Sequence, residues 1–251
     1  MGAFRKRVKN LLGKITGYEI ARFGDKSFIF TDTWFSRSAQ ISSIIDKFGI
    51  DLVIDVGANE GSFAQELRSF YRGEILSFEP VSSVFEKLAA AAASDPNWHV
   101  YKVALGNQES TQTIHVSNET VFSSLLKAND YCAQRFGDDA LGTKEEVVSV
   151  RRLDNLLQEI APDFGSKHIF LKMDTQGYDI EVFKGLGSKL KHVVALQSEV
   201  SLISIYEGMP HWTENICTYE RAGFGVAGMF PISQDSYRII EYDCLLVRVE
   251  S

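Results

Sequence analysis

The stretch VIDVGANEGSFA, Val53–Ala64, begins as an apolar strand and then changes into a loop that contains glycines. Counted from Gly57, the dinucleotide-binding pattern Gly-x-Gly-x-x-Gly requires glycine at the positions of Asn59 and Ser62, and neither residue is a glycine. The Gly-Lys-Ser/Thr of a phosphate-binding loop is missing from the stretch as well. The sequence therefore predicts a tight turn at the end of a strand that is poorly suited to a pyrophosphate.

The turn carries an acid and two glycines, Asp55-x-Gly57-x-x-x-Gly61, and the next strand pattern ends in Glu79. A carboxylate after the first strand repels a diphosphate but suits an ammonium group, and glycines permit a tight turn that leaves room for a ligand. An acid after the second strand is placed to accept both hydroxyls of a ribose. An amine and a ribose without phosphate describe S-adenosylmethionine, which we favour over NAD and over a turn without a ligand.

Strand and helix patterns alternate from residue 51 onward. Apolar stretches predict strands at Asp51–Val56, Glu74–Glu79, Val100–Leu105, Thr111–Ser117, Val147–Val150, His168–Met173, His192–Glu199, Phe224–Phe230 and Ile239–Val249. Helices are predicted at Trp34–Phe48, Ser62–Tyr71, from Ser83 (with a capping box of Ser83 and Glu86), and at Leu153–Ile160, Tyr178–Leu186 and His211–Ala222. This order predicts an α/β protein with a mostly parallel sheet, helices on both faces and an antiparallel strand at the end.

The bulk composition limits the function. The chain has 251 residues, a net charge of −7 and a pI of about 5.3, which argues against broad binding of nucleic acids. The three cysteines are far apart and form no zinc-binding pattern. No apolar run has transmembrane length and no hydrophobic signal segment opens the sequence, so we expect a cytoplasmic location.

The first part of the chain is expected to be a helical extension, residues 1–48, ahead of one large domain, residues 49–251. Near the start, an apolar helical stripe runs from Phe4 to Ile15 among several lysines and arginines. A basic amphipathic helix can lie on an anionic membrane, but one short helix binds lipid weakly. We therefore favour docking of this stripe on the domain itself over membrane contact.

The longer motifs resemble the FkbM-type methyltransferase family, a class I group that depends on S-adenosylmethionine. The resemblance covers residues 51–249, and its specific marks are FLKMDTQGYDIEVFKG and LQSEVSLISIYEGMP. It implies a Rossmann-like, seven-stranded fold with an antiparallel last strand, and O-methyl transfer to a sugar, a glycolipid or a secondary metabolite. The sequence departs from the family at Gln176, where many members have glutamate.

The cofactor residues follow from the glycine turn together with this resemblance. Main-chain and apolar groups of Ala104 and Leu105, at the end of the third strand, are expected to line the adenine slot. Gln176 has no proton-accepting carboxylate, but its amide can bond the acceptor or the cofactor. The complete set of expected cofactor contacts is Asp55, Gly57, Ala58, Asn59, Gly61, Glu79, Pro80, Ala104, Leu105, Asp174 and Gln176.

Candidate catalytic residues end the following strands. Methyl transfer from a sulfonium is an in-line displacement, and a hydroxyl acceptor needs a base or a metal ion to activate it. Asp174 ends the strand IFLKMD, and Glu199 ends the strand LQSE, so both acids are expected in one cleft. These two carboxylates are also the expected ligands if a divalent metal ion takes part. Lys172 and His211 complete the candidate set.

Structural roles compete with these catalytic ones. Lys172 points to the same face as Asp174, so a structural lysine–carboxylate pair is as good an interpretation as a catalytic one. Glu199 would then serve only to neutralise Lys172. His211 has a suitable pKa for a base, but a single histidine at the start of a helix is more often structural.

The combined prediction is an S-adenosylmethionine-dependent O-methyltransferase. Its acceptor is expected to be a small molecule or a glycan, with a hydroxyl of a sugar or glycolipid precursor favoured. Contacts to that acceptor are expected from the polar region 118–146 and from residues 206–212, since long irregular loops often serve as lids. The alternatives are a secondary-metabolite O- or N-methyltransferase and a non-catalytic S-adenosylmethionine-binding module.

Overall fold

The computed structural model describes residues 19–23, 26–30 and 36–249. The chain divides into two compact units, residues 1–43 and 44–251. In the first unit, β1 (Glu19–Phe23) pairs antiparallel with β2 (Lys26–Phe30). The helix α2 (Arg37–Phe48) spans the division. The region expected as a helical extension thus contains two strands as well as a helix, and the basic stripe from Phe4 to Ile15 lies outside the described residues.

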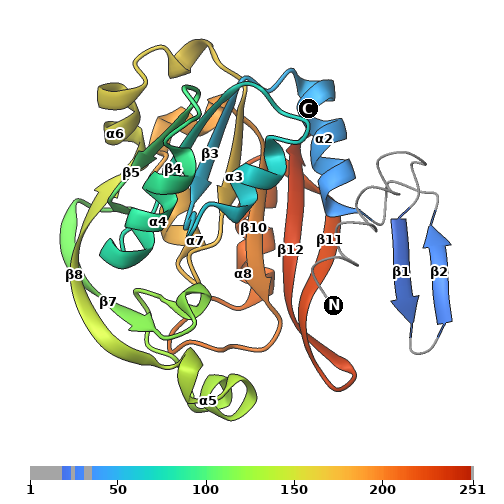
Figure 1. Ribbon diagram of the computed structural model, residues 1–251. Helices are drawn as coiled ribbons and strands as arrows, with labels where there is room; N and C mark the ends of the chain where they lie inside the picture. The colour runs from blue at the N-terminus through green and yellow to red at the C-terminus, as the bar shows by residue number, and fades with distance from the viewer. Residues whose placement is uncertain (1–18, 24–25, 31–35, 250–251) are drawn as a thin grey trace. The chain divides into compact units, whose positions relative to one another are not determined.

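The larger unit is built on a seven-stranded sheet with the order β11-β12-β10-β9-β3-β4-β5 (Figure 1). Its strands are β3 (Leu52–Val56), β4 (Glu74–Phe78), β5 (Trp98–Tyr101), β9 (Ile169–Met173), β10 (Val193–Ser201), β11 (Phe224–Asp235) and β12 (Arg238–Arg248). Neighbours from β5 to β10 are parallel, whereas β12 is antiparallel to both β10 and β11. This confirms the predicted class I fold. The antiparallel last strand is inserted beside β10, and β11 forms the edge.

Helices cover both faces of this sheet. They are α3 (Ser62–Leu67), α4 (Ser82–Ala92), α6 (Leu153–Ile160), α7 (Asp179–Lys184) and α8 (Trp212–Arg221). On one face, Phe63 of α3 stacks on Phe170 of β9. On the other face, Phe183 of α7 meets Tyr219 of α8 edge to face, within the apolar core that contains Leu171. The central strands β3 and β9 are buried along their whole length, as expected for parallel strands covered twice.

A second, three-stranded sheet corrects the strand prediction Val100–Leu105. The main-sheet strand β5 ends at Tyr101, and the chain then forms β6 (Ala104–Gly106) in the smaller sheet of order β6-β8-β7. There, β7 (Ser110–Ser117) pairs antiparallel with the long strand β8 (Gly142–Arg152). The predicted irregular region 118–146 includes the 3-10 turns η2 (Thr120–Phe122) and η3 (Asp138–Ala140), the helix α5 (Asp130–Phe136) and the first residues of β8.

The start of α4 also differs from the prediction. The helix begins at Ser82 with Val81 as its N-cap residue, and no side chain of the cap bonds the helix. The predicted capping box of Ser83 and Glu86 is therefore wrong. Glu146 of β8 replaces it, because its carboxylate accepts the Ser82 amide at 3.1 Å. A cap that comes from a distant strand leaves no local signal in the sequence.

Candidate active site

The glycine turn after β3 packs against the neighbouring strand β9. Gly57 has φ +71°, and a Cβ at this position would lie 1.9 Å from the main-chain oxygen of Asp174. At Gly61, with φ +88°, a Cβ would lie 2.7 Å from the Trp98 ring. Both positions therefore require glycine for a close approach of the chain to itself. The pattern that suggested room for a ligand reflects, in the first place, a tightly packed turn.

A buried ion pair lies beneath this turn. The Lys172 ammonium lies 3.1 Å from Asp55 Oδ1 and 3.5 Å from Asp174 Oδ2, and it donates to the Gly57 carbonyl at 3.0 Å. Burial opposes the charge of Lys172, but Asp55 and Asp174 outweigh it and hold the pKa of the ammonium above its ordinary value. The Asp55 side chain is fully buried and also accepts the Ser77 hydroxyl at 3.3 Å. Lys172 thus occupies Asp55, the residue that we expected to meet a ligand's ammonium group.

Glu79 closes the second strand with both carboxylate oxygens held in place. Its Oε2 accepts the Asn59 amide at 3.0 Å and its Oε1 accepts the Val81 amide at 2.9 Å. Burial raises the pKa of Glu79 to about 7, although these two bonds favour the charged form. A carboxylate oxygen has two acceptor positions, so each oxygen retains one for a further donor. This geometry suits a ligand with two adjacent hydroxyls.

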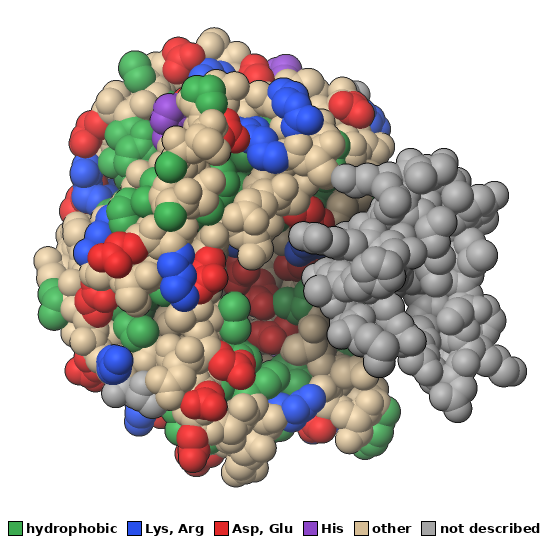
Figure 2. Space-filling model, viewed as in Figure 1, with side chains coloured by type: hydrophobic (Ala, Val, Ile, Leu, Met, Phe, Trp, Pro, Cys, Tyr) green, Lys and Arg blue, Asp and Glu red, His purple; other side chains and the backbone are tan. Residues whose placement is uncertain are grey.

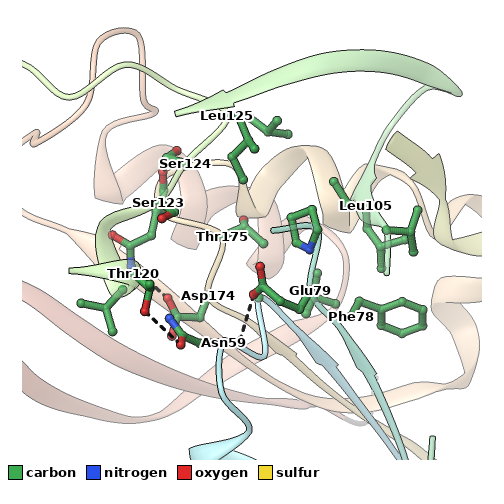
Figure 3. A pocket seen from close by; sticks show the side chains of 18 of the residues that line it. Asn59, Phe78, Glu79, Leu105, Thr120, Ser123, Ser124, Leu125, Asp174 and Thr175 are labelled. Carbon is green, nitrogen blue, oxygen red and sulfur yellow. Dashed lines mark hydrogen bonds between the residues drawn. The ribbon is translucent and has the colours of Figure 1, made fainter. Parts of the chain in front are cut away.

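A pocket of about 280 Å³ opens over Glu79 (Figure 3). One part of it is apolar and is lined by Phe78, Pro80, Val103, Ala104, Leu105 and Ile114. The other part is polar, with side chains from the β3 turn, from the loop around η2 and from the ends of β9 and β10. These polar residues are Asn59, Thr120, Ser123, Ser124, Asp174, Thr175, Gln176 and Glu199. Figure 3 shows Phe78 and Leu105 at one side, Thr120 and Ser123 at the other, and Glu79 between them.

Asp174, which directly follows β9, and Glu199, two residues before the end of β10, are linked in the polar part through Gln176. The Gln176 amide nitrogen donates to Asp174 Oδ1 at 3.0 Å and to Glu199 Oε2. Burial raises the pKa of Asp174, but Lys172 and hydrogen bonds outweigh it and hold that pKa below its ordinary value. Burial and the negative charges of Asp174 and Glu241 raise the pKa of Glu199 well above its ordinary value. Relative to an ordinary carboxyl group, the site thus favours the charged form of Asp174 and the protonated form of Glu199.

Further acids extend from this pair into the sheet. The register places Glu199 opposite Asp243 of β12 and Ser201 opposite Glu241. Burial raises the pKa of Glu241 as well, and the negative charge of Asp174 adds to the shift. Figure 2 shows Asp and Glu side chains gathered in a hollow of the viewed face. Negative charge is thus in excess around the polar part of the pocket.

Asp179 is a functional residue that the sequence reasoning missed. Its buried carboxylate accepts the amides of Thr175 at 2.9 Å and Glu199 at 3.1 Å, and the Ser198 hydroxyl at 2.7 Å. Asp179 therefore links two segments at one side of the pocket, the loop that follows β9 and the strand β10. The sequence signal was an acid at the start of a helix four residues after Thr175, which is a common pattern and carries little information alone.

The structure separates the remaining predicted residues into two groups. Those that line the pocket are Gly57, Asn59, Glu79, Pro80, Ala104, Leu105, Asp174, Gln176 and Glu199. The second group does not line the pocket. Ala58 and Gly61 belong to the turn itself, and Asp55 and Lys172 lie beneath it. His211 lies elsewhere, as the N-cap of α8 with its Nδ1 2.7 Å from the Thr213 hydroxyl. Lining residues that the sequence did not indicate are Val56, Phe78, Val103, Ile114 and Thr175, whereas Thr120, Val121 and Leu125 belong to the expected region 118–146.

The loop residues that we expect to contact an acceptor also fall into two groups, those that reach the pocket and those that do not. Ser123 and Ser124 line the pocket, and Tyr206 reaches it indirectly by donating its hydroxyl to Gln176 Oε1 at 2.7 Å. Tyr131 instead donates to Asp235 on the β11–β12 hairpin. Phe122 packs beside Phe136, away from the polar part.

The hydrogen-bonding groups and the apolar surface of the pocket fit S-adenosylmethionine. Glu79 provides two acceptors for ribose hydroxyls, the apolar part suits an adenine, and the acids suit a positively charged group. The pocket lies beyond the carboxyl ends of β3, β4 and β9, which is where open α/β sheets bind ligands. For a metal ion, residues 19–23, 26–30 and 36–249 contain no group of three or more His, Cys, Asp or Glu side chains placed to hold one.

This fold and this pocket define a class I methyltransferase that uses S-adenosylmethionine. The family model of the methyltransferase FkbM domain matches residues 55–224, and the chain belongs to this family. The resemblance seen in the motifs is thereby confirmed. No curated protein matches the chain. None of the described helices is long and apolar enough to cross a membrane.

Solved structures are similar to the chain at low sequence identity. Magnesium protoporphyrin IX methyltransferase from Synechocystis PCC 6803 with bound S-adenosylmethionine is 11% identical at a TM-score of 0.46, covering 86% of this chain and 80% of that one. Fibrillarin from Aeropyrum pernix with bound S-adenosylmethionine is 11% identical at a TM-score of 0.45, covering 95% of this chain and 87% of that one. An rRNA methylase from Streptococcus thermophilus is 9% identical at a TM-score of 0.44, covering 84% and 96%.

Proposed function

We propose that the protein transfers the methyl group of S-adenosylmethionine to a hydroxyl oxygen of a sugar or of a glycolipid precursor, with Asp174 as the base. One observation carries the proposal. Two acids, Asp174 and Glu199, line the same pocket as Glu79, and the loop with the hydroxyl groups of Thr120, Ser123 and Ser124 lines it too.

The cofactor, when bound, supplies an electrophilic methyl group on sulfur. The protein holds it through Glu79 at the ribose and through the apolar lining at the adenine. Asp174 would accept the proton of the acceptor hydroxyl as the carbon–oxygen bond forms and the carbon–sulfur bond breaks, with S-adenosylhomocysteine as the leaving group. Its side chain is 37% exposed, so the proton then has a path to water. Much of the rate enhancement comes from the alignment of acceptor oxygen and methyl group, which the rigid ends of β9 and β10 favour.

The chemistry of the polar part supports a neutral, hydroxyl-bearing acceptor. Thr120, Ser123 and Ser124 offer hydroxyl donors and acceptors on one side of it. The excess of acids on the other side disfavours an acceptor whose phosphate or carboxylate enters the pocket. A protonated amine would also bind beside these acids, and transfer to nitrogen is therefore the second candidate. It requires the amine to lose its proton before it can attack.

A transfer assay with labelled S-adenosylmethionine tests the proposal. The purified protein is mixed with host extract that has been separated into glycan, lipid, small-metabolite and protein fractions. We expect label in the glycan or lipid-linked sugar fraction, and NMR of the product should place the methyl carbon on oxygen. Label found only on nitrogen, or only in protein, would contradict the proposal. A protein that binds S-adenosylhomocysteine but labels no fraction would favour the non-catalytic binding module.

A further inference from the structure

Gln176 adopts an unusual backbone conformation in the loop between β9 and α7. Its φ is +54°, in the left-handed region that side chains with a Cβ rarely occupy, and Gly177 follows with φ +90°. The Ser124 hydroxyl donates to the Gln176 carbonyl at 2.7 Å, which holds this conformation from the loop after η2. Gly177 in turn packs closely, since a Cβ there would lie 3.1 Å from both Leu126 and Met209. Strained residues of this kind persist where the surrounding structure determines them, and they are frequent at active sites.

The amide nitrogen and the carbonyl oxygen of the Gln176 side chain both have hydrogen-bond partners in the site. Its two N–H groups point to Asp174 Oδ1 and Glu199 Oε2, and its carbonyl oxygen accepts the Tyr206 hydroxyl. The partners fix the orientation of the amide, because a reversed amide would aim its oxygen at two carboxylates. Gln176 is 8% exposed, so each of these bonds forms with little competition from water.

A neutral donor suits the surroundings that this chain gives to position 176. Asp174 and Glu199 already share a region with Glu241 and Asp243, and Lys172 is engaged with Asp55 and Asp174. A third carboxylate at position 176 would add repulsion at hydrogen-bond distance. The amide instead bonds both acids whether or not either one carries a proton, and it holds them at a fixed separation.

We propose that Gln176 is a positioning residue of methyl transfer: its amide sets the separation of Asp174 and Glu199, and couples this pair to the pocket loop through Tyr206 and Ser124. The inference rests on the proposed function for its kinetic consequences. Its structural part, the link between the amide and the two acids, holds for the protein without any acceptor.

Carboxyl titration tests that structural part directly. Asp174 and Glu199 are followed by 13C NMR from pH 3 to pH 9 in the wild-type protein and in Q176A and Q176E. In Q176A we expect both acids to lose a donor and to titrate at higher pH. In Q176E the added charge should move the curves further, by about one pH unit or more. E181Q on α7, outside the pocket lining, is the control, because it leaves both amide–carboxylate bonds and Tyr206 in place, and its curves should coincide with those of the wild type.

Turnover tests the kinetic part, once an acceptor has been found by the labelling assay. For Q176E we expect kcat to fall by about tenfold to a hundredfold, with the acidic limb of the pH profile moved to higher pH, because the base must lose its proton. The dissociation constant for S-adenosylhomocysteine should change much less. Q176N keeps an amide on a shorter side chain, and its kcat should lie between those of the wild type and Q176A. This variant maintains the test if Q176E does not fold.

The outcomes separate this inference from the proposed function. Unchanged carboxyl titrations in Q176A and Q176E would overturn the inference, whatever the enzyme methylates. The same result follows if E181Q shifts the curves as much as Q176A does, or if all variants lose stability while the pH profile stays in place. Shifted titrations in a protein that transfers no methyl group to oxygen would uphold the link and overturn the proposed function.

Discussion

The two ends of the pocket are built by different means. The cofactor end, which consists of Gly57, Asn59, Glu79 and the apolar lining, is shaped by main-chain amides and by two strands that follow each other in the sequence. The proposed acceptor end, which consists of Asp174, Gln176, Glu199 and the loop Thr120–Leu125, is shaped by bonds between side chains. The comparison teaches that main-chain amides fix one end of the pocket, whereas side-chain partners fix the other.

The largest effect is expected from removing the base at the acceptor end. Asp174→Asn keeps the shape of the side chain but removes its charge, so turnover should fall by about a hundredfold to ten-thousandfold. Binding of S-adenosylhomocysteine, measured by calorimetry, should weaken by less than about tenfold if the two ends are independent. Glu181→Gln on α7, outside the pocket lining, is the matched control and should keep full turnover. Equal losses of binding and turnover in D174N would remove the distinction between the ends.

A methyl group added at Gly57 should disrupt the cofactor end because it would clash with the main chain. Gly57→Ala places a Cβ against the Asp174 carbonyl and keeps a φ that disfavours alanine, so we expect a loss of about 3 kcal/mol or more in the free energy of unfolding. Gly208 has a nearly equal φ of +72°, and a Cβ at this position would have nothing within 4 Å. Gly208→Ala should therefore cost only about 1 kcal/mol. Urea unfolding compares the two, and similar losses would show that packing against β9 is unimportant.

Glu79 should make cofactor binding depend on pH. The ionised carboxylate is the better acceptor of two hydroxyls, and burial places its pKa at about 7. The affinity for S-adenosylhomocysteine should therefore rise about tenfold between pH 6 and pH 8. Glu79→Gln should weaken binding by about tenfold or more and remove this dependence. Calorimetry across the pH range checks both, and a pH profile that is the same in E79Q and wild type would assign the dependence to another group.

The raised pKa of Glu79 affects stability in the opposite direction, because it lowers the free energy of unfolding as pH rises. The pKa of Glu79 is raised from its ordinary value of 4.5 to about 7, with burial as the main cause. The folded protein thus keeps a proton that the unfolded chain releases, so the contribution of Glu79 to stability falls as pH rises from about 4.5 through about 7. Subtracting the unfolding curves of wild type and E79Q at several pH values isolates this contribution.

The smallest effect is expected at His211, which the structure places outside both ends. Its imidazole caps α8, so His211→Ala should lower the free energy of unfolding by about 0.5–1 kcal/mol. Turnover should stay at the wild-type level over the whole pH range. A loss of turnover without a loss of stability would bring His211 back into the acceptor end.

The sequence predicted the cofactor end better than the acceptor end for a physical reason. Asp55, Gly57 and Glu79 stand at fixed distances from strand ends, and parallel strands bring such ends together without further information. Even there, the pattern misassigned two causes, since Gly57 serves a close approach to β9 and Asp55 holds Lys172. Local patterns give the positions of residues more reliably than the partners of their side chains.

At the acceptor end the partners come from far along the chain. The contact of Gln176 with Tyr206 spans thirty residues, and outside the pocket the contact of Ser82 with Glu146 spans sixty-four. The split of Val100–Leu105 into β5 and β6 likewise depends on pairing with β8, which follows about forty residues later. No periodicity in one segment contains such information, so the acids were placed in one cleft while their bridging by Gln176 was not foreseen.

The insertion of β12 between β10 and β11 has a consequence for the order in which the protein is made. The strands β3 and β4 can pair soon after their synthesis, but β10 lacks a neighbour on one side until Arg238–Arg248 has left the ribosome. Until then an unpaired strand edge is exposed, together with Glu199 before it meets Asp243. An exposed strand edge of this kind favours aggregation of a nascent chain.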